Sequence, residues 1–178
     1  MKKLLIALAA VIVSVASFAQ GTVTFNTRIT GVLDAPVLSG ASGLGVGPDY
    51  TGELFVVSGA TPGVIAASKT PFRSGSELAQ RYVTTVSEVA IPGVDAGGNV
   101  KFRFRAYKTS AGSWDAAGND RGASADFSIA SGSLGGGLTP PANLVGITGF
   151  SVGGVIPEPS TIALGVLGAA ALLFRRRK

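Results

Sequence analysis

The 178-residue chain contains neither cysteine nor histidine. Without thiolates and imidazoles, Cys/His zinc sites, thiol nucleophiles and histidine-based catalytic triads are excluded. The lack of cysteine also removes disulfide bonds, so the folded state must be stabilised by apolar burial and backbone pairing. Several classes of metalloprotein and hydrolase are therefore ruled out before any motif is considered.

Charged residues are also scarce, at 14% of the chain, and in the body they balance. Residues 20–156 hold nine basic and nine acidic side chains, whereas the whole chain has a formal net charge of +5. The excess positive charge therefore lies in the segments on either side of the body. A neutral body gives no electrostatic reason to expect nucleic acid as a partner. Its length suits one hydrophobic core and is too short for two.

The first nineteen residues have the layout of a secretory signal peptide. Met1-Lys2-Lys3 is basic, residues 4–15 are apolar, and Ser17-Phe18-Ala19 is a small-x-small cleavage site. We expect passage through the Sec translocon and cleavage by signal peptidase after Ala19. The alternative is an N-terminal membrane anchor, which the short apolar run and the cleavage site disfavour.

The segment after the body combines three elements in order. Pro157-Glu158-Pro159 holds the chain extended, because proline lacks an amide hydrogen and restricts the residue before it. Residues 162–174 carry no charge, and Ser160 is suitably positioned to cap a helix through them. Four cations follow: Arg175, Arg176, Arg177 and Lys178.

A helix over residues 162–174 is short for a bilayer. At 1.5 Å per residue it reaches about 20 Å, against roughly 30 Å of hydrocarbon. Local thinning of the bilayer and snorkelling arginine side chains offset the difference at modest cost. The four cations should stay in the cytoplasm, which leaves everything before Pro157 outside. A short transmembrane helix in contact with membrane lipid is the prediction.

This order of elements resembles the PEP-CTERM sorting signal of Gram-negative bacteria. The resemblance implies that a membrane-embedded exosortase reads the signal and cuts near Pro157-Glu158-Pro159. The rest of the chain would then be released, or transferred to the cell surface or an exopolysaccharide matrix. The alternatives are an uncleaved tail anchor and a buried core helix. Four terminal cations and the lack of a polar face disfavour a core helix.

The body also resembles PEP-CTERM proteins of the Verrucomicrobia type. This likeness is carried by Gln20-Gly21-Thr22-Val23-Thr24-Phe25-Asn26, Phe104-Arg105-Ala106-Tyr107 and Arg121-Gly122-Ala123-Ser124-Ala125-Asp126-Phe127. This resemblance indicates where the protein is delivered and says little about its biochemical activity.

Alternation of apolar and polar residues predicts strands in the body. In the clearest case, Val100, Phe102, Phe104 and Ala106 alternate with Lys101, Arg103, Arg105 and Tyr107. One face is mainly aromatic and the other mainly cationic, as in an antiparallel strand with one wet side. Further strands are predicted at residues 21–30, 53–58, 63–67, 82–91, 126–130 and 144–152.

Turn residues suggest how two of these strands connect. Pro92-Gly93 should end one strand, and the glycine-rich residues 95–99 tolerate positive φ at little cost. Ile91 and Val100 therefore bracket a predicted hairpin. In the last strand, Val145 and Ile147 are expected to share a face.

Six to nine short strands without an amphipathic helix predict an all-β body, as an antiparallel β-sandwich or a jelly-roll-like fold. An N-terminal signal helix and a short C-terminal transmembrane helix should flank this body. The predicted organisation is a signal peptide at 1–19, a β-sandwich domain of unknown activity at 20–153, and a PEP-CTERM sorting signal at 154–178.

The body offers few candidates for binding. Lys101, Arg103, Arg105 and Lys108 form a basic stripe that suits an acidic polysaccharide, and Tyr107 and Trp114 have rings that can stack on sugars. The simpler interpretation, which we favour, is a solvated strand face that discourages edge-to-edge pairing, with aromatic residues in core or rim packing.

A calcium site on Asp115, Asn119 and Asp120 is the minor alternative to ordinary exposed turn residues, because the spacing does not match an EF-hand loop. We expect no metal and no cofactor.

Three hypotheses for function remain. The first is a non-catalytic protein of the cell surface or exopolysaccharide matrix, exported across the inner membrane, briefly anchored and then processed. The second is a carbohydrate-binding module of that matrix. The third is a secreted hydrolase, which needs two acids across a cleft. Glu53, Glu77 and Glu88 are available, but their spacing singles out no pair. We expect no enzyme activity.

Overall fold

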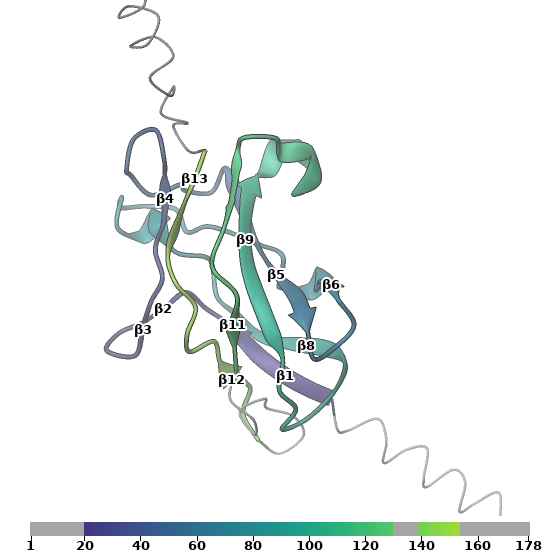
Figure 1. Ribbon diagram of the computed structural model, residues 1–178. Helices are drawn as coiled ribbons and strands as arrows, with labels where there is room; N and C mark the ends of the chain where they lie inside the picture. Colours follow the sequence, from purple (N-terminus) through teal and green to yellow (C-terminus); the bar gives the residue numbers. More distant parts are fainter. Residues whose placement is uncertain (1–19, 130–138, 154–178) are drawn as a thin grey trace, which may run out of the picture.

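The computed structural model describes residues 20–129 and 139–153, which form mainly β-strands (Figure 1). The helices in these two ranges are three-residue 3-10 turns: η1 Ala66–Ser68, η2 Ala79–Arg81, η3 Thr109–Ala111 and η4 Asp115–Ala117. The all-β prediction is therefore confirmed for this part of the chain. None of its helices has the length and apolar character needed to cross a bilayer. The predicted signal helix and transmembrane helix lie outside the described residues.

One sheet has three strands in the order β12-β1-β8. Its central strand is β1 Gln20–Phe25, which pairs antiparallel with β8 Val86–Asp95 and parallel with β12 Ala142–Asn143. In β1, Val23 and Phe25 are fully buried. The alternating sequence thus gives a strand with an apolar face, as expected.

The larger sheet has six strands and is built around β5 Tyr50–Ser58 and β9 Lys101–Lys108. These two strands pair antiparallel, from Tyr50 opposite Lys108 to Val56 opposite Phe102. Shorter strands pair with them on either side, namely β6 Gly63–Val64 and β7 Thr70–Pro71 with β5, and β10 Arg121–Ala123 and β11 Phe127–Ser128 with β9. Strand β9 therefore lies inside the sheet, so protection of a free edge is not a role for its basic residues.

Two small ribbons complete the described part. β4 Val37–Ser39 pairs in parallel with β13 Phe150–Val152, and β2 Arg28–Ile29 forms a hairpin with β3 Leu33–Asp34. The β1–β12 and β4–β13 pairs are parallel, so the prediction of an antiparallel body is wrong for these two contacts. Both pairs join segments far apart in the sequence, which a local pattern does not reveal.

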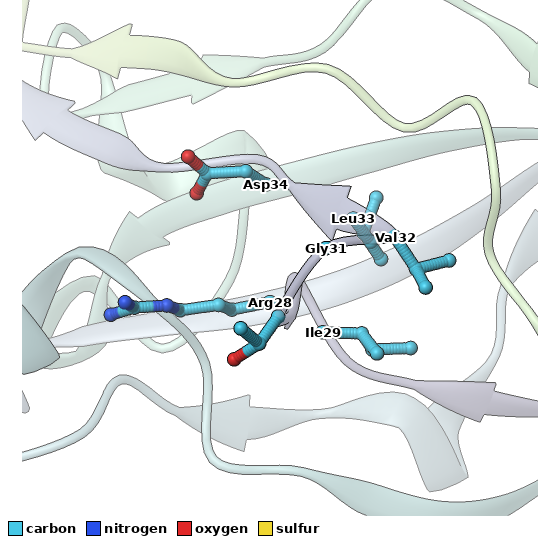
Figure 2. Close-up of a pocket in the computed structure, with 7 residues that line it drawn as sticks. Arg28, Ile29, Gly31, Val32, Leu33 and Asp34 are labelled. Carbon is cyan, nitrogen blue, oxygen red and sulfur yellow. The ribbon is translucent and has the colours of Figure 1, made fainter.

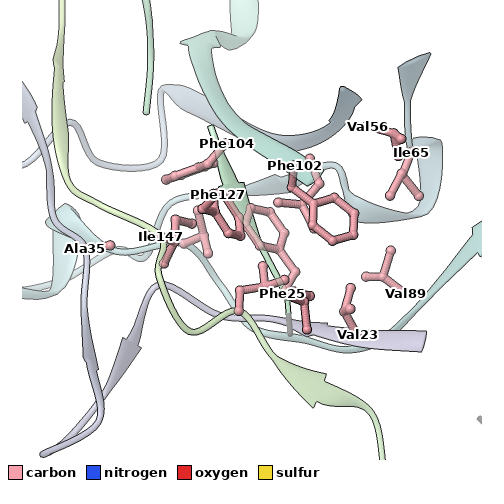
Figure 3. Packing of buried hydrophobic residues seen from close by; sticks show 14 of the residues in the cluster. Val23, Phe25, Ala35, Val56, Ile65, Val89, Phe102, Phe104, Phe127 and Ile147 are labelled. Atoms are coloured by element: carbon pink, nitrogen blue, oxygen red, sulfur yellow. The ribbon is translucent and has the colours of Figure 1, made fainter. Parts of the chain in front are cut away.

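The two larger sheets pack against each other around Phe104 of β9 (Figure 3). Its ring centroid lies 5.4 Å from that of Phe25 on β1 and 5.1 Å from that of Phe150 on β13, both edge to face. A third ring, Phe72, stacks on it with centroids 6.3 Å apart. Edge-to-face and offset pairs are the favoured arrangements of aromatic rings. A single aromatic core therefore joins the two layers.

The predicted hairpin between Ile91 and Val100 is wrong. Strand β8 pairs with β1 and strand β9 pairs with β5, so the two strands lie in different sheets. Pro92 and Gly93 fall inside β8, and the turn comes later, where the Gly98 amide donates to the Asp95 carbonyl. Each strand has one buried face. Period-two alternation identifies such a face but does not distinguish pairing within one sheet from packing across two.

The prediction for the last strand is also wrong. Val145 is 57% exposed whereas Ile147 is 4% exposed, so they do not share a face. Residues 144–147 form a turn in which the Ile147 amide donates to the Leu144 carbonyl. The strand is confined to β13, because Gly146 has a φ of 105°, a conformation that suits glycine and interrupts extended backbone.

We expect Phe104→Ala to lower the free energy of unfolding by about 3–5 kcal/mol, because a ring between three other rings leaves a cavity when truncated. Urea unfolding followed by fluorescence or circular dichroism measures the loss. Val145→Ala, at an exposed position, is the control and should stay within about 0.5 kcal/mol of the wild type. Equal stabilities of the two variants would contradict the central position of Phe104.

Candidate functional site

Three cations of the basic stripe predicted on β9, Lys101, Arg103 and Arg105, alternate with buried residues and lie on the outer face of the larger sheet, whereas Lys108 has the phase of the buried residues. Acidic residues neutralise two of the four cations. The Arg103 Nε lies 2.7 Å from the Asp126 Oδ1, and the Lys108 Nζ lies 3.7 Å from the Asp120 Oδ2. The hydrogen bond from Arg103 lowers the pKa of Asp126. These pairs reduce the positive field that an acidic polymer would meet, which favours a solvated strand face, without the edge-protecting role, over a polysaccharide site.

Arg105 has a different environment, because its strand partner is a buried acid. Glu53 on β5 lies directly opposite Arg105 on β9, and Glu53 is 1% exposed. The Glu53 Oε2 lies 3.9 Å from the Lys69 Nζ. Neither the Glu53 Oε1 nor the Arg105 Nε has a hydrogen-bond partner, although both atoms are buried. Burial raises the pKa of Glu53 and lowers the pKa of Arg105, since desolvation disfavours the charged form of each group.

Aromatic rings surround the Arg105 guanidinium. Its Cζ lies 3.5 Å from the ring centroid of Phe55 and 5.1 Å from that of Trp114. The Cζ of Arg121 lies 5.0 Å from the same tryptophan ring, and its Nη1 donates to the Trp114 carbonyl at 2.8 Å. These four residues, Phe55, Arg105, Trp114 and Arg121, form what we call the Trp114 cluster. Cation–π contacts hold all four side chains of this cluster on the outer face.

The loop after β9 positions Trp114 over the sheet. Helix η3 is followed by Gly112 at its C-cap, with the left-handed φ of 74° that glycine allows, and Trp114 occupies the N-cap position of η4. Trp114 is half-buried, so part of its ring stays accessible. Tyr107 is 3% exposed, so the structure does not bring it to the surface with Trp114.

Two members of the cluster were missed by the sequence analysis. Phe55 belongs to an apolar run in which Leu54 and Val56 are the buried residues, and its position between them puts it on the opposite face. This alternation was visible in the sequence. The contact of Arg121 with Trp114 was not visible, since it depends on the path of the loop.

The acids considered for calcium are engaged with cations. The Asp115 Oδ1 lies 3.8 Å from the Arg121 Nη1, and Asp120 pairs with Lys108. Across residues 20–129 and 139–153, no three acidic side chains gather closely enough to hold a metal ion.

The three glutamates considered for hydrolysis lie apart. Glu53 is buried under the outer face, Glu77 accepts two hydrogen bonds from Arg81 at 2.9 Å, and Glu88 is exposed on β8. None of them lines the hollow of about 380 Å³ at the β2–β3 hairpin, whose lining is residues 28–34 (Figure 2).

That hollow is formed by one hairpin and carries little chemistry. Arg28 packs over the Tyr82 ring with its Cζ 4.9 Å from the centroid, and the Tyr82 hydroxyl donates to the Asp34 Oδ1 at 2.7 Å. The charged groups on its wall are thus already engaged by the neighbouring tyrosine.

The buried Glu53 predicts a pH dependence of stability. Because its pKa is raised in the folded state, the native protein holds this proton more tightly than the unfolded chain. The stabilisation from this group is therefore present below about pH 4.5 and is lost as the pH rises through the folded-state pKa. We expect Glu53→Gln, which cannot ionise, to gain stability relative to the wild type between pH 4 and pH 7.

Urea unfolding of both proteins at the two pH values tests this expectation. Glu88→Gln, at an exposed acid on β8, is the matched control for removing one negative charge. A Glu53→Gln variant that loses stability relative to the wild type as the pH rises would show that the carboxylate stabilises the fold.

The predicted signal cleavage at Ala19 and the predicted sorting residues Pro157, Glu158, Pro159, Arg175, Arg176, Arg177 and Lys178 lie outside the described residues. Comparison with known proteins bears on the second group. No curated protein and no solved structure matches the chain. The family model for the PEP-CTERM protein-sorting motif matches residues 155–178, which begin two residues after the last described residue, Gly153. This chain is therefore a protein with a PEP-CTERM sorting motif, as its sequence predicts.

Proposed function

We propose that the protein is a non-catalytic component of the cell surface or the exopolysaccharide matrix of a biofilm, delivered there by an exosortase. The observation that carries this proposal is the PEP-CTERM motif at residues 155–178. The motif implies export and an exosortase as the processing partner. Residues 1–19 support the same route independently, because they have the layout of a signal peptide.

In this proposal the chain is anchored in the membrane for a short time. The apolar residues 162–174 hold it in the inner membrane, and the four cations that follow stay in the cytoplasm. Cleavage near Pro157-Glu158-Pro159 then frees the β-sandwich body. The body is electrically neutral over residues 20–156, which suits a component that has to coexist with other matrix polymers without strong attraction or repulsion.

A non-catalytic role is supported by the positions of the acidic residues. A hydrolase of the two-carboxylate type needs two acids on opposite sides of a cleft. In the described residues, Glu53 is buried, Glu77 is held by Arg81 in a loop, and Glu88 stands on a different sheet from Glu53.

Intact mass tests the proposal. In cells with their exosortase, we expect a mature protein that begins at Gln20 and lacks the segment after the cleavage point. In cells without the enzyme, the product should begin at Gln20 and retain Lys178. The same retention is expected for a variant in which Pro157, Glu158 and Pro159 are all alanine. A cytosolic, soluble chain that keeps both Met1 and Lys178 would contradict the export route.

A second candidate function is carbohydrate binding, and the Trp114 cluster is the observation that favours it. A partly exposed indole next to the guanidinium groups of Arg105 and Arg121 combines a stacking surface with positive charge. Arg103 contributes less than the sequence suggested, because Asp126 neutralises it, and the buried Tyr107 contributes no stacking surface.

We expect Trp114→Ala to abolish retention of the mature protein on an immobilised acidic polysaccharide if this second function is correct. Lys101→Ala, at an exposed cation on the same strand as Arg105, is the control for a general loss of charge. Equal retention of the wild type and both variants, or none by any of them, removes carbohydrate binding as a function of the cluster.

A further inference from the structure

Strand β13 holds the end of the body firmly. It pairs in parallel with β4, from Phe150 opposite Val37 to Val152 opposite Ser39, and Val152 is fully buried. The Gly40 amide donates to the Val152 carbonyl at 2.7 Å. On its other side β13 lies so close to β10 that a Cβ on Gly122 would be 2.3 Å from the Ser151 oxygen. The fold is therefore fixed up to Val152.

The chain leaves the body at one end of the molecule. Figure 1 shows the far end of β13 beside the turn that follows β4 and the loop that follows β9, whereas β12 lies at the opposite end. Gly153 is also close to Asp120, since a Cβ at Gly153 would lie 3.8 Å from the Asp120 Oδ1. We call this region, formed by residues 40–44 and 109–120, the exit surface.

Leu44 is the exposed apolar side chain of the turn in the exit surface. The turn is tight, because the Gly43 amide donates to the Ser39 carbonyl and the Ser39 amide donates to the Leu44 carbonyl. Leu44 is 53% exposed. It is therefore held rigidly at the point where the chain departs toward the sorting motif.

The sorting motif begins very near this surface. Three residues, 154–156, separate Gly153 from Pro157. Pro157 is four positions after Gly153, so their Cα atoms are at most roughly 14 Å apart in any conformation of the segment. An enzyme that cuts near Pro157 has to bring its active site within this reach. During the cut the folded body is therefore tethered close to the enzyme, and the exit surface is the part of the body from which the tether leaves.

We propose that the exit surface docks on the exosortase and that Leu44 supplies an apolar contact in this complex. The inference rests on the proposed function, since it takes the exosortase to be the processing enzyme. The fixed strand β13 and the short spacing together keep the motif near the exit surface, so the folded body contributes to recognition alongside the motif itself.

Pulse-chase conversion of the full-length precursor to its mature form, in cells that contain the exosortase, tests this proposal. We expect Leu44→Glu to slow conversion by at least about threefold, because the apolar contact is lost. Val145→Glu is the matched control. It is similarly exposed, at 57%, and it follows β12 at the opposite end of the molecule, so its conversion should match the wild type.

A second variant leaves the sequence of the body unchanged. Eight Gly and Ser residues inserted after Gly153 separate the exit surface from the motif, so docking no longer positions the motif at the active site. We expect slower conversion and, within this longer chain, no further effect of Leu44→Glu. This measurement remains decisive even if Leu44→Glu impairs folding of the unmodified chain.

Conversion at the wild-type rate in Leu44→Glu and in the insertion variant would overturn the proposal. A mature protein that binds vesicles of phosphatidylethanolamine and phosphatidylglycerol through Leu44 would also overturn it, because lipid would then be the partner. If the proposed function itself is wrong, the wild-type precursor stays unprocessed in the presence of the exosortase. This result differs from every outcome above, in which the wild type is processed.

Discussion

The contact of Phe104 with three other rings is the interaction on which the described body depends. Phe25, Phe72 and Phe150 come from three separate parts of the chain and meet on a ring in the middle of the larger sheet. A chain without disulfides has no covalent link to hold two layers together. Burial of large aromatic surfaces, with their preferred edge-to-face geometry, therefore takes over this role.

On the outer face of the larger sheet, Arg103 is paired and Arg105 is covered, whereas Lys101 is exposed. Arg103 and Lys108 have acidic partners, while Arg105 lies between Phe55 and Trp114 and opposite the buried Glu53. The result is a surface with little free charge, in agreement with the neutral composition of residues 20–156. The Glu53 Oε1 and the Arg105 Nε are buried without a hydrogen-bond partner, although the two residues lie opposite each other in the ladder.

The sequence predicted the all-β class and the strands with strict alternation, because a buried face leaves a direct trace in residues such as Phe102 and Phe104. The sorting motif was predictable for a similar reason, since its three elements are contiguous. What failed were the pairings of strands, both for neighbours in the chain and for distant segments. Strands β8 and β9 are neighbours in the chain but belong to different layers, and β13 pairs with β4 across more than a hundred residues. In the Trp114 cluster, the outward position of Phe55 was predictable from the alternation in β5. The contact of Arg121 with Trp114 was not predictable, because it depends on the path of a loop.

The tight passage of β13 over Gly122 has a consequence for the order of events during secretion. A chain that crosses the membrane from its amino end delivers β4 and β10 to the outside well before β13. The body can assemble most of its core at that stage, but the slot between β4 and Gly122 stays empty until residues 150–152 arrive. The final closure of the fold therefore waits for residues that stand immediately before the sorting motif at 155–178, so that the body and the motif become available at nearly the same stage of export.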